Sequence, residues 1–242
     1  MKTLVQSLLK PFGLRLTRIG SNMPNYGATV LFETLRRFGF SPKCILDIGA
    51  NRGNWTRSAL QFFPEAEYVL VEPQAHLKVY SQDLLESGRV RWINAGAADH
   101  SGRMHFYVAN RDDSSSFLPW QATNQSGHEI DVEVMTVNDL LGSSGLPIPD
   151  MVKIDAEGFD LKVLRGASNL IGKTDVFLLE AAALCQFQNT MSCVISTMDN
   201  LGYRILDITE LNRSPKHGVL WLTELAFLRK GSPLLDSVTS YE

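Results

Sequence analysis

Acidic residues placed beside glycines carry the chemistry that this sequence suggests. The first group lies in the segment Asp47-Ile48-Gly49-Ala50-Asn51-Arg52-Gly53-Asn54-Trp55-Thr56, a glycine turn that follows an apolar strand. Glycines let the backbone take dihedral angles closed to other residues and approach a ligand closely. A dinucleotide-binding turn would carry glycines where Asn51 and Asn54 stand. Asp47, two residues before Gly49, would repel a pyrophosphate but suits the ammonium of an amino-acid-bearing cofactor, which points to S-adenosylmethionine.

A second acid, Glu72, ends the next apolar strand, Tyr68-Val69-Leu70-Val71-Glu72-Pro73. An acid at the tip of this strand is placed to accept hydrogen bonds from both hydroxyls of a ribose. Nicotinamide and adenosyl cofactors both contain a ribose. Glu72 therefore indicates an adenosyl cofactor only in combination with Asp47 and the glycine turn. A strand-end acid beside a tight turn with no ligand is the alternative.

A third group is the segment Lys153-Ile154-Asp155-Ala156-Glu157-Gly158-Phe159-Asp160, at the end of a later apolar strand. Ligands of open α/β sheets bind at the carboxyl ends of the strands, where the strand order reverses. We therefore expect Asp155 and Glu157 to face the cofactor, as a general base with an orienting group or as cation ligands. The alternatives are that Glu157 caps the next helix and that Asp155 pairs with Lys153.

The elements that must position these residues alternate between buried strands and amphipathic helices, which predicts an α/β fold with a mostly parallel sheet. Strands are expected at 43–49, 68–73, 90–94, 151–155 and 176–180, and helices at 55–63, 75–86 and 160–170. From about 103 to 137 the period changes to that of an inserted β-hairpin, with strands at 104–108 and 130–137. A helix at 191–201 precedes strands at 203–207 and 222–228.

This pattern divides the chain into an N-terminal helical extension (1–40), one domain (41–230) and a frayed tail (231–242). The extension carries Lys2, Lys10, Arg15 and Arg18 without an acid before Glu33. A basic amphipathic helix that packs on the domain or on a second subunit is the simpler interpretation. Contact with a membrane surface or an anionic substrate is the alternative.

The composition argues against several classes of protein. A net charge of -3 provides no global basic field for nucleic acid. The sequence contains no apolar run of about 18 residues, so we expect no spanning helix. The three cysteines, Cys44, Cys185 and Cys193, have neither zinc-site spacing nor the density of a disulfide scaffold. We therefore expect a reduced, cytoplasmic protein.

Several segments of the chain together resemble the FkbM-type S-adenosylmethionine-dependent methyltransferases: 47–56, 71–73, 94–102, 114–117 and 152–167. The most family-specific is the run from Lys153 to Asp160, followed by Val163-Leu164-Arg165-Gly166-Ala167. The resemblance covers about residues 43 to 181. It implies a class I methyltransferase (Rossmann-like) fold, with a seven-stranded sheet whose last strand is antiparallel, and usually O-methylation of a hydroxyl on a sugar, polyketide or other natural product.

The resemblance also implies residue roles. The methionine end of the cofactor would lie against Asp47, Gly49, Asn51 and Gly53, with Thr56 at the start of the helix. Glu72 would hold the ribose, Ala97 to Asp99 the adenine edge, and Asp155 would lie between cofactor and substrate. The acceptor would be a small molecule or a glycan. Asn54, Trp55 and the Ala181-Ala182-Ala183 run depart from the family pattern.

Methyl transfer to oxygen needs alignment of donor and acceptor and removal of one proton, with no covalent nucleophile. We expect Asp155 to position or deprotonate the acceptor, with Glu157 as second candidate and His128 or His105 as outside candidates. We expect no metal, because no histidine accompanies Glu157 at ligand spacing. The polar loop from Arg111 to Gly127, with Phe117 and Trp120, is a candidate lid or a solvated connection.

Two other classes of protein stay open. A nicotinamide-dependent oxidoreductase would share the sheet and Glu72, but the sequence lacks the dinucleotide glycines and a Tyr-x-x-x-Lys pair. A scaffold or assembly subunit could retain the fold without turnover, because a fold does not prove an activity.

Overall fold

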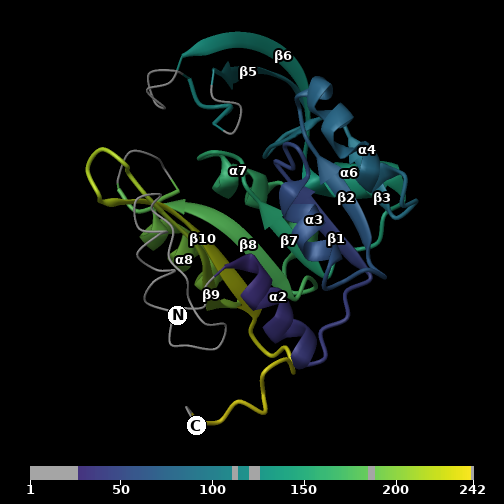
Figure 1. Cartoon of the computed structure of the whole chain (residues 1–242), viewed down its shortest axis with the longest axis vertical. Helices are drawn as coiled ribbons and strands as arrows, with labels where there is room; N and C mark the ends of the chain where they lie inside the picture. The colour runs from purple at the N-terminus through teal and green to yellow at the C-terminus, as the bar shows by residue number, and fades with distance from the viewer. Residues whose placement is uncertain (1–26, 111–113, 120–125, 185–188, 241–242) are drawn as a thin grey trace, which may run out of the picture.

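A seven-stranded sheet forms the centre of the computed structural model, which describes residues 27–110, 114–119, 126–184 and 189–240 (Figure 1). Its strands are β1 (Cys44–Ile48), β2 (Glu67–Val71), β3 (Val90–Ile93), β7 (Met151–Ile154), β8 (Val176–Ala182), β9 (Tyr203–Arg213) and β10 (Leu220–Arg229). Their order is β3-β2-β1-β7-β8-β10-β9. The first five pair in parallel, whereas β10 lies antiparallel to both β8 and β9. The predicted sheet with its antiparallel last strand is confirmed.

The central strands are buried on both faces, which explains their continuous apolar runs. Every residue of β1 and β7 is buried. On one face, β-strand side chains pack with helices α2 (Ala28–Arg37) and α3 (Asn54–Leu60). On the other face they pack with α6 (Val137–Ser144), α7 (Asp160–Arg165) and α8 (Met191–Asn200). Two apolar cores therefore hold the strand ends, and the residues on them, in fixed positions.

Some helices differ from the sequence-based prediction. The helix expected at 75–86 is a 3-10 helix, η2 (Ala75–Ser81), followed by one α-helical turn, α4 (Gln82–Leu85). The helix expected at 160–170 ends at Arg165, and the 3-10 helix η3 (Ser168–Leu170) follows. Gly166 at the end of α7 lets this segment pack closely on the chain after β4, because a Cβ there would lie 2.1 Å from the Ala98 carbonyl oxygen. Helix α6 was not predicted, although its Thr136 cap accepts a hydrogen bond from Asp139 N at 3.0 Å.

The inserted hairpin is confirmed and forms a second, smaller sheet. Strands β5 (Gly102–Ala109) and β6 (Gly127–Met135) are antiparallel, and the short β4 (Gly96–Ala97) pairs with β6. Figure 1 shows this small sheet standing apart from the main one, at the top of the view. Ser116 connects the small sheet to the segment after β7. It forms a β-bridge with Tyr107 and donates from Oγ to the Glu157 carbonyl at 2.8 Å.

Several segments with predicted roles lie wholly or partly outside the described residues. The basic segment of the expected N-terminal extension falls in residues 1–26, whereas α2 belongs to the described part. Asp112, Asp113 and Trp120 of the candidate lid also lie outside it. Among the helices that the structure describes, none is both long and apolar enough to cross a membrane.

Candidate active site

A cavity of about 450 Å³ opens at the carboxyl ends of the central strands. Its walls come from the β1–α3 turn, the end of β2, the end of β7, the small sheet and strands β9 and β10. The predicted site residues that line it are Gly49, Asn51, Glu72, Ala97, Asp155 and Glu157. The three groups of residues singled out in the sequence therefore meet in one place, at the strand-order reversal between β1 and β7.

The glycine turn after β1 is packed directly against the segment that carries Asp155. Gly49 has a φ of 75°, and a Cβ there would lie 1.8 Å from the Asp155 carbonyl oxygen. The Asp155 amide donates to the Ile48 carbonyl at 3.0 Å. Asn51, also at positive φ (47°), follows in the same turn. A side chain at position 49 would therefore push the two main walls of the cavity apart.

Glu72 does more in the structure than end its strand. It is 3% exposed, and its Oε2 accepts a hydrogen bond from the Asn51 amide at 2.9 Å. Its Oε1 accepts from the Gln74 amide at 3.0 Å. Burial raises the pKa of Glu72, against the lowering effect of these hydrogen bonds. The carboxylate therefore fastens the glycine turn to the end of β2 while one side of it faces the cavity.

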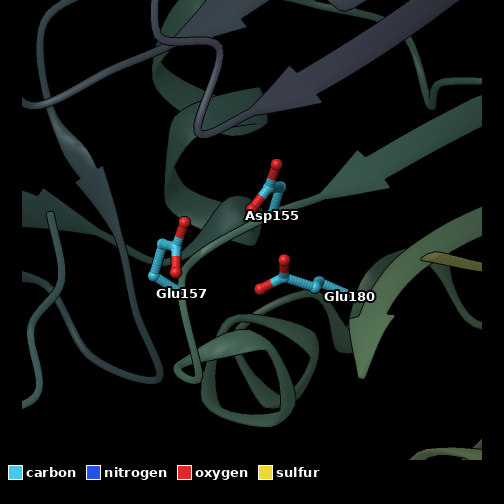
Figure 2. A group of neighbouring side chains, drawn as sticks. All are labelled: Asp155, Glu157 and Glu180. Carbon is cyan, nitrogen blue, oxygen red and sulfur yellow. The ribbon is translucent and has the colours of Figure 1, made fainter. Parts of the chain in front are cut away.

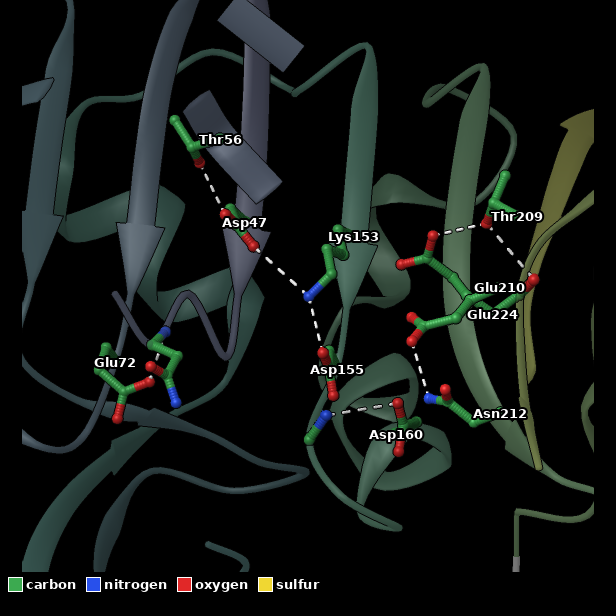
Figure 3. Close-up of polar contacts among 12 residues, drawn as sticks. Asp47, Thr56, Glu72, Lys153, Asp155, Asp160, Thr209, Glu210, Asn212 and Glu224 are labelled. Carbon is green, nitrogen blue, oxygen red and sulfur yellow. Dashed lines mark hydrogen bonds and ion pairs between the residues drawn. The ribbon is translucent and has the colours of Figure 1, made fainter. Parts of the chain in front are cut away.

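Asp47 lies behind the cavity wall, and Lys153 connects it to Asp155. Asp47 is fully buried, and its Oδ2 accepts from Thr56 Oγ1 at 2.6 Å. Lys153 Nζ lies 3.8 Å from Asp47 Oδ1 and donates to Asp155 Oδ2 at 2.9 Å (Figure 3). Burial lowers the pKa of Lys153, but the charges of Asp155, Asp47 and Glu224 together have the larger effect and raise the pKa above its usual value. The ammonium therefore stays charged. The pairing of Asp155 with Lys153, an alternative above, is confirmed.

A second acidic group extends from Asp155 toward β8. Oxygen atoms of Asp155, Glu157 and Glu180 all lie within 4.8 Å of one another, and the three carboxylates face a common space in Figure 2. Burial, together with the charges of Asp155, Glu157 and Asp160, raises the pKa of Glu180 well above its usual value. Such a group can share a proton or hold a cation, and the expectation of no metal stays a prediction.

The turn after β7 is held by Asp160. Its carboxylate accepts from the Gly158 amide at 3.2 Å and from the Ala156 amide at 3.4 Å. Asn189 Nδ2 donates to the same carboxylate at 3.0 Å. Within this turn Glu157 has a φ of 48°, which is uncommon for a residue with a side chain. The strained turn presents Glu157 to the cavity.

Other predicted residues lie outside the cavity lining. Gly53 precedes α3, where a Cβ would lie 2.6 Å from Leu84 Cδ1, and Thr56 supports Asp47 from within that helix. Asp99 instead contacts His100 Nδ1 at 2.9 Å and approaches Arg165 Nε at 3.8 Å. The structure thus brings Ala97, but not Asp99, to the cavity, and the adenine contact of Asp99 stays a prediction.

The two histidine candidates also lie away from the cavity. His105 and His128 are exposed on the small sheet, and His105 pairs with Asp131 at 2.6 Å. The described part of the candidate lid does reach the site. Phe117 lines the cavity and packs on Phe159, with ring centroids 5.3 Å apart.

The wall formed by β9 and β10 was not predicted from the sequence. Thr209, Glu210 and Glu224 line the cavity on this side. A signal was present, since Glu224 interrupts the apolar strand Leu220-Trp221-Leu222-Thr223-Glu224-Leu225-Ala226-Phe227-Leu228. A buried acid in such a strand needs a partner or a ligand.

Comparison with known proteins identifies the fold and the family of this chain. The 2-O-methyltransferase NoeI of Sinorhizobium fredii is 26% identical over 144 residues, which cover 54% of this chain and 59% of NoeI. The O-methyltransferase TomG of Streptomyces achromogenes, solved in complex with SAM, shares the fold with a TM-score of 0.51 at 13% identity, over 95% of this chain and 89% of TomG. The match to NoeI spans less than two thirds of that protein's length.

A structure of methyltransferase FkbM from Methylobacillus flagellatus KT has a TM-score of 0.50 at 18% identity, over 77% of this chain and 43% of that chain. The fold is therefore that of the class I methyltransferases. The Methyltransferase FkbM domain matches residues 47–205, from the acid before the glycine turn to β9. The chain therefore belongs to the FkbM methyltransferase domain family, with S-adenosylmethionine as its cofactor.

Proposed function

We propose that this protein transfers a methyl group from S-adenosylmethionine to a hydroxyl oxygen of a small molecule or glycan. One observation carries the proposal: the glycine turn, Glu72 and Asp155 surround a single cavity at the switch point of the sheet. NoeI, which is named a 2-O-methyltransferase, supports oxygen as the acceptor atom.

The residues around the cavity suit a cofactor with a positive charge. Glu72, Asp155 and Glu157 line it, and the turn at Gly49 exposes backbone to a ligand. Glu72 would hold the ribose, and Gly49 and Asn51 would contact the methionine end. Asp47 is fully buried, so it would support the site indirectly, through its contacts with Thr56 and Lys153.

When bound, S-adenosylmethionine supplies a methyl group already activated by the sulfonium charge. The protein then has to align the acceptor oxygen with the methyl carbon and receive one proton. Asp155 lies at the end of β7 with Lys153 bound to one carboxylate oxygen at 2.9 Å. Asp155 is thus held rigidly beside the glycine turn, where it orients the acceptor. Glu157 is the second residue for this role.

Titration calorimetry with S-adenosylhomocysteine tests the proposal. We expect micromolar binding by the wild type and at least a tenfold loss in Glu72→Gln, since an amide cannot accept both backbone hydrogen bonds. Glu133→Gln is the matched control, because Glu133 is exposed on β6, away from the cavity. Failure of the wild type to bind S-adenosylhomocysteine would refute the proposal and favour the scaffold alternative. Binding of NAD but not of S-adenosylhomocysteine would favour the oxidoreductase.

Activity separates an enzyme from a scaffold that retains the cofactor. We expect labelled methyl groups from S-adenosylmethionine to appear on a hydroxylated acceptor, and Asp155→Asn to reduce turnover far more than cofactor affinity. Equal losses of both would assign Asp155 to cofactor binding. A glycan acceptor, a homo-oligomer, a cytoplasmic location and peripheral membrane contact by the basic N-terminus stay predictions.

A further inference from the structure

The cavity has a second buried carboxylate, on the wall opposite Glu72. Glu224 on β10 is 7% exposed and lines the cavity together with Thr209 and Glu210 of β9. Its strand neighbours from Leu225 to Leu228 are buried and apolar. Removing a carboxylate from water is costly unless a partner or ligand compensates it. The apolar neighbours on its own strand offer Glu224 no such compensation, so a partner or ligand must come from elsewhere.

Glu224 has one partner and one available oxygen. Thr209 Oγ1 donates to Glu224 Oε1 at 2.5 Å, which fixes the orientation of the carboxylate (Figure 3). Within the described ranges, no cation lies within 4.0 Å of this carboxylate and no second hydrogen bond reaches it. The other oxygen, Oε2, is not fully buried. Because Glu224 lines the cavity, Oε2 is accessible from it.

Asp155 differs from Glu224 in this respect. One oxygen of Asp155 already accepts a hydrogen bond from Lys153 at 2.9 Å, and the ammonium balances its charge. A carboxylate that is neutralised by a fixed cation gains less from taking a proton than one without such a partner. Of the two, Glu224 is better suited to accept a proton and Asp155 to orient.

We infer that Glu224, held in place by Thr209, contacts the acceptor and receives the proton of the hydroxyl that is methylated. The inference rests on the proposed methyltransferase function. As the new oxygen–carbon bond forms, the sulfur–carbon bond breaks and its electron pair stays on sulfur. The hydroxyl proton moves to Glu224 Oε2, which leaves a neutral carboxylic acid, a methyl ether and S-adenosylhomocysteine.

The charges around Glu224 support a role as base. Burial raises its pKa, Lys153 and the Thr209 hydrogen bond lower it, and the charges of Asp155 and Glu210 raise it, which together give a pKa of about 7. Glu180 faces it directly across the β8–β10 pair. A base with a pKa near the working pH is effective, because it is partly charged before the reaction and holds the proton afterwards.

The same charges indicate the chemical class of the acceptor. The cavity is lined by the acids Glu72, Asp155, Glu157, Glu210 and Glu224, against the bases Arg52 and Lys153. Arg52 stacks on Tyr80, and Lys153 is bound to Asp155. An acceptor that carries phosphate or carboxylate would be repelled, so we assign a neutral polyhydroxylated acceptor, such as an uncharged pyranoside.

The test uses the full chain, S-adenosylmethionine with a labelled methyl group, a panel of neutral methyl pyranosides and the matching uronates and sugar phosphates. The variants are Glu224→Gln, Thr209→Val and the control Glu133→Gln. We expect methylation of neutral pyranosides only. We also expect kcat to fall about 100-fold or more in Glu224→Gln and about tenfold in Thr209→Val, with the control unchanged. In the wild type kcat should rise with pH through about 7, and Glu224→Gln should lose this rise.

Titration with S-adenosylhomocysteine separates the two levels of inference. All three variants should bind it within about twofold of the wild type, because Glu224 and Thr209 lie across the cavity from Glu72. A wild type that binds the cofactor product but methylates none of the neutral pyranosides, or a Glu224→Gln variant with wild-type kcat and pH profile, overturns the assignment of Glu224 and its acceptor. A wild type that does not bind overturns the proposed function itself, and this inference with it.

Discussion

Lys153 and Asp155 are joined by a hydrogen-bonded ion pair of 2.9 Å at the end of β7, and the same ammonium lies 3.8 Å from the fully buried Asp47. One cation therefore compensates an acid inside the sheet and an acid on the cavity wall. The glycine turn lies directly above this pair, since Asp155 N donates to Ile48 O at 3.0 Å. Lys153 thus connects a buried acid inside the sheet with an acid on the cavity wall.

Removal of the Lys153 charge should destabilise the protein. Lys153→Met leaves Asp47 buried without a cation, and breaking a buried pair costs about 3 to 5 kcal/mol of unfolding free energy. Urea unfolding measures this loss. Lys78→Met is the control, because Lys78 is exposed on η2. A change below about 0.5 kcal/mol in Lys153→Met would show that the pair does not compensate Asp47.

A side chain at position 49 should abolish cofactor binding. The Cβ of Gly49→Ala would lie 1.8 Å from the Asp155 carbonyl oxygen, so the turn and the β7 end would have to separate. Gly88→Ala is a matched control, since Gly88 has a similar φ of 70° but nothing within 4 Å of its Cβ position. Calorimetry with S-adenosylhomocysteine should show loss of binding in the first variant and normal binding in the second. Equal affinities would contradict the packing argument.

The pH dependence of stability should reveal Glu224. Its pKa is about 7 in the folded protein, above the value near 4.5 of an unburied glutamate. Between these values the folded state holds the proton more tightly, so the contribution of Glu224 to stability is full below pH 4.5 and decreases as the pH rises to about 7.

Chemical denaturation of the wild type and Glu224→Gln at pH 5 and pH 8 measures this effect. The variant should gain stability relative to the wild type at pH 8 by about 2 kcal/mol compared with pH 5. Glu133→Gln, on the exposed side of β6, should show no such difference. A pH-independent difference between the wild type and Glu224→Gln would mean that Glu224 is ionised throughout this range.

Chelation should leave the protein active. Lys153 already balances Asp155, and burial raises the pKa of Glu180 well above its usual value, which disfavours the charged carboxylate that a cation would need. We expect methyl transfer and S-adenosylhomocysteine affinity to change less than about twofold after dialysis against EDTA. Loss of activity that Mg²⁺ restores would instead show that the group of Asp155, Glu157 and Glu180 holds a cation.

Local sequence patterns were sufficient for the sheet and for half of the cavity. The buried runs of β1, β2 and β7 identify parallel strands, because both of their faces are covered. The end of each strand then places the Gly49 turn, Glu72 and Asp155 at one edge of the sheet. Helix α6 was missed, although Thr136 and Asp139 form a recognisable cap.

The other half depends on contacts between segments far apart in the chain. Asp99 follows Ala97 closely, yet only Ala97 reaches the cavity, because Asp99 turns toward His100 and Arg165. Thr209 and Glu224 meet only because β10 inserts between β8 and β9. No spacing in the sequence encodes that insertion.

The sequence by itself determined the family, the fold and half of the cavity lining, because these depend on patterns within single strand-turn-helix units. The tertiary structure alone decided which carboxylates are paired with Lys153, which share one space and which keep an available oxygen. Burial and neighbouring charges set the proton affinity of each acid, and both arise from the packing of β7, β8, β9 and β10 side by side. The division of labour between Asp155 and Glu224 is therefore a property of the folded sheet.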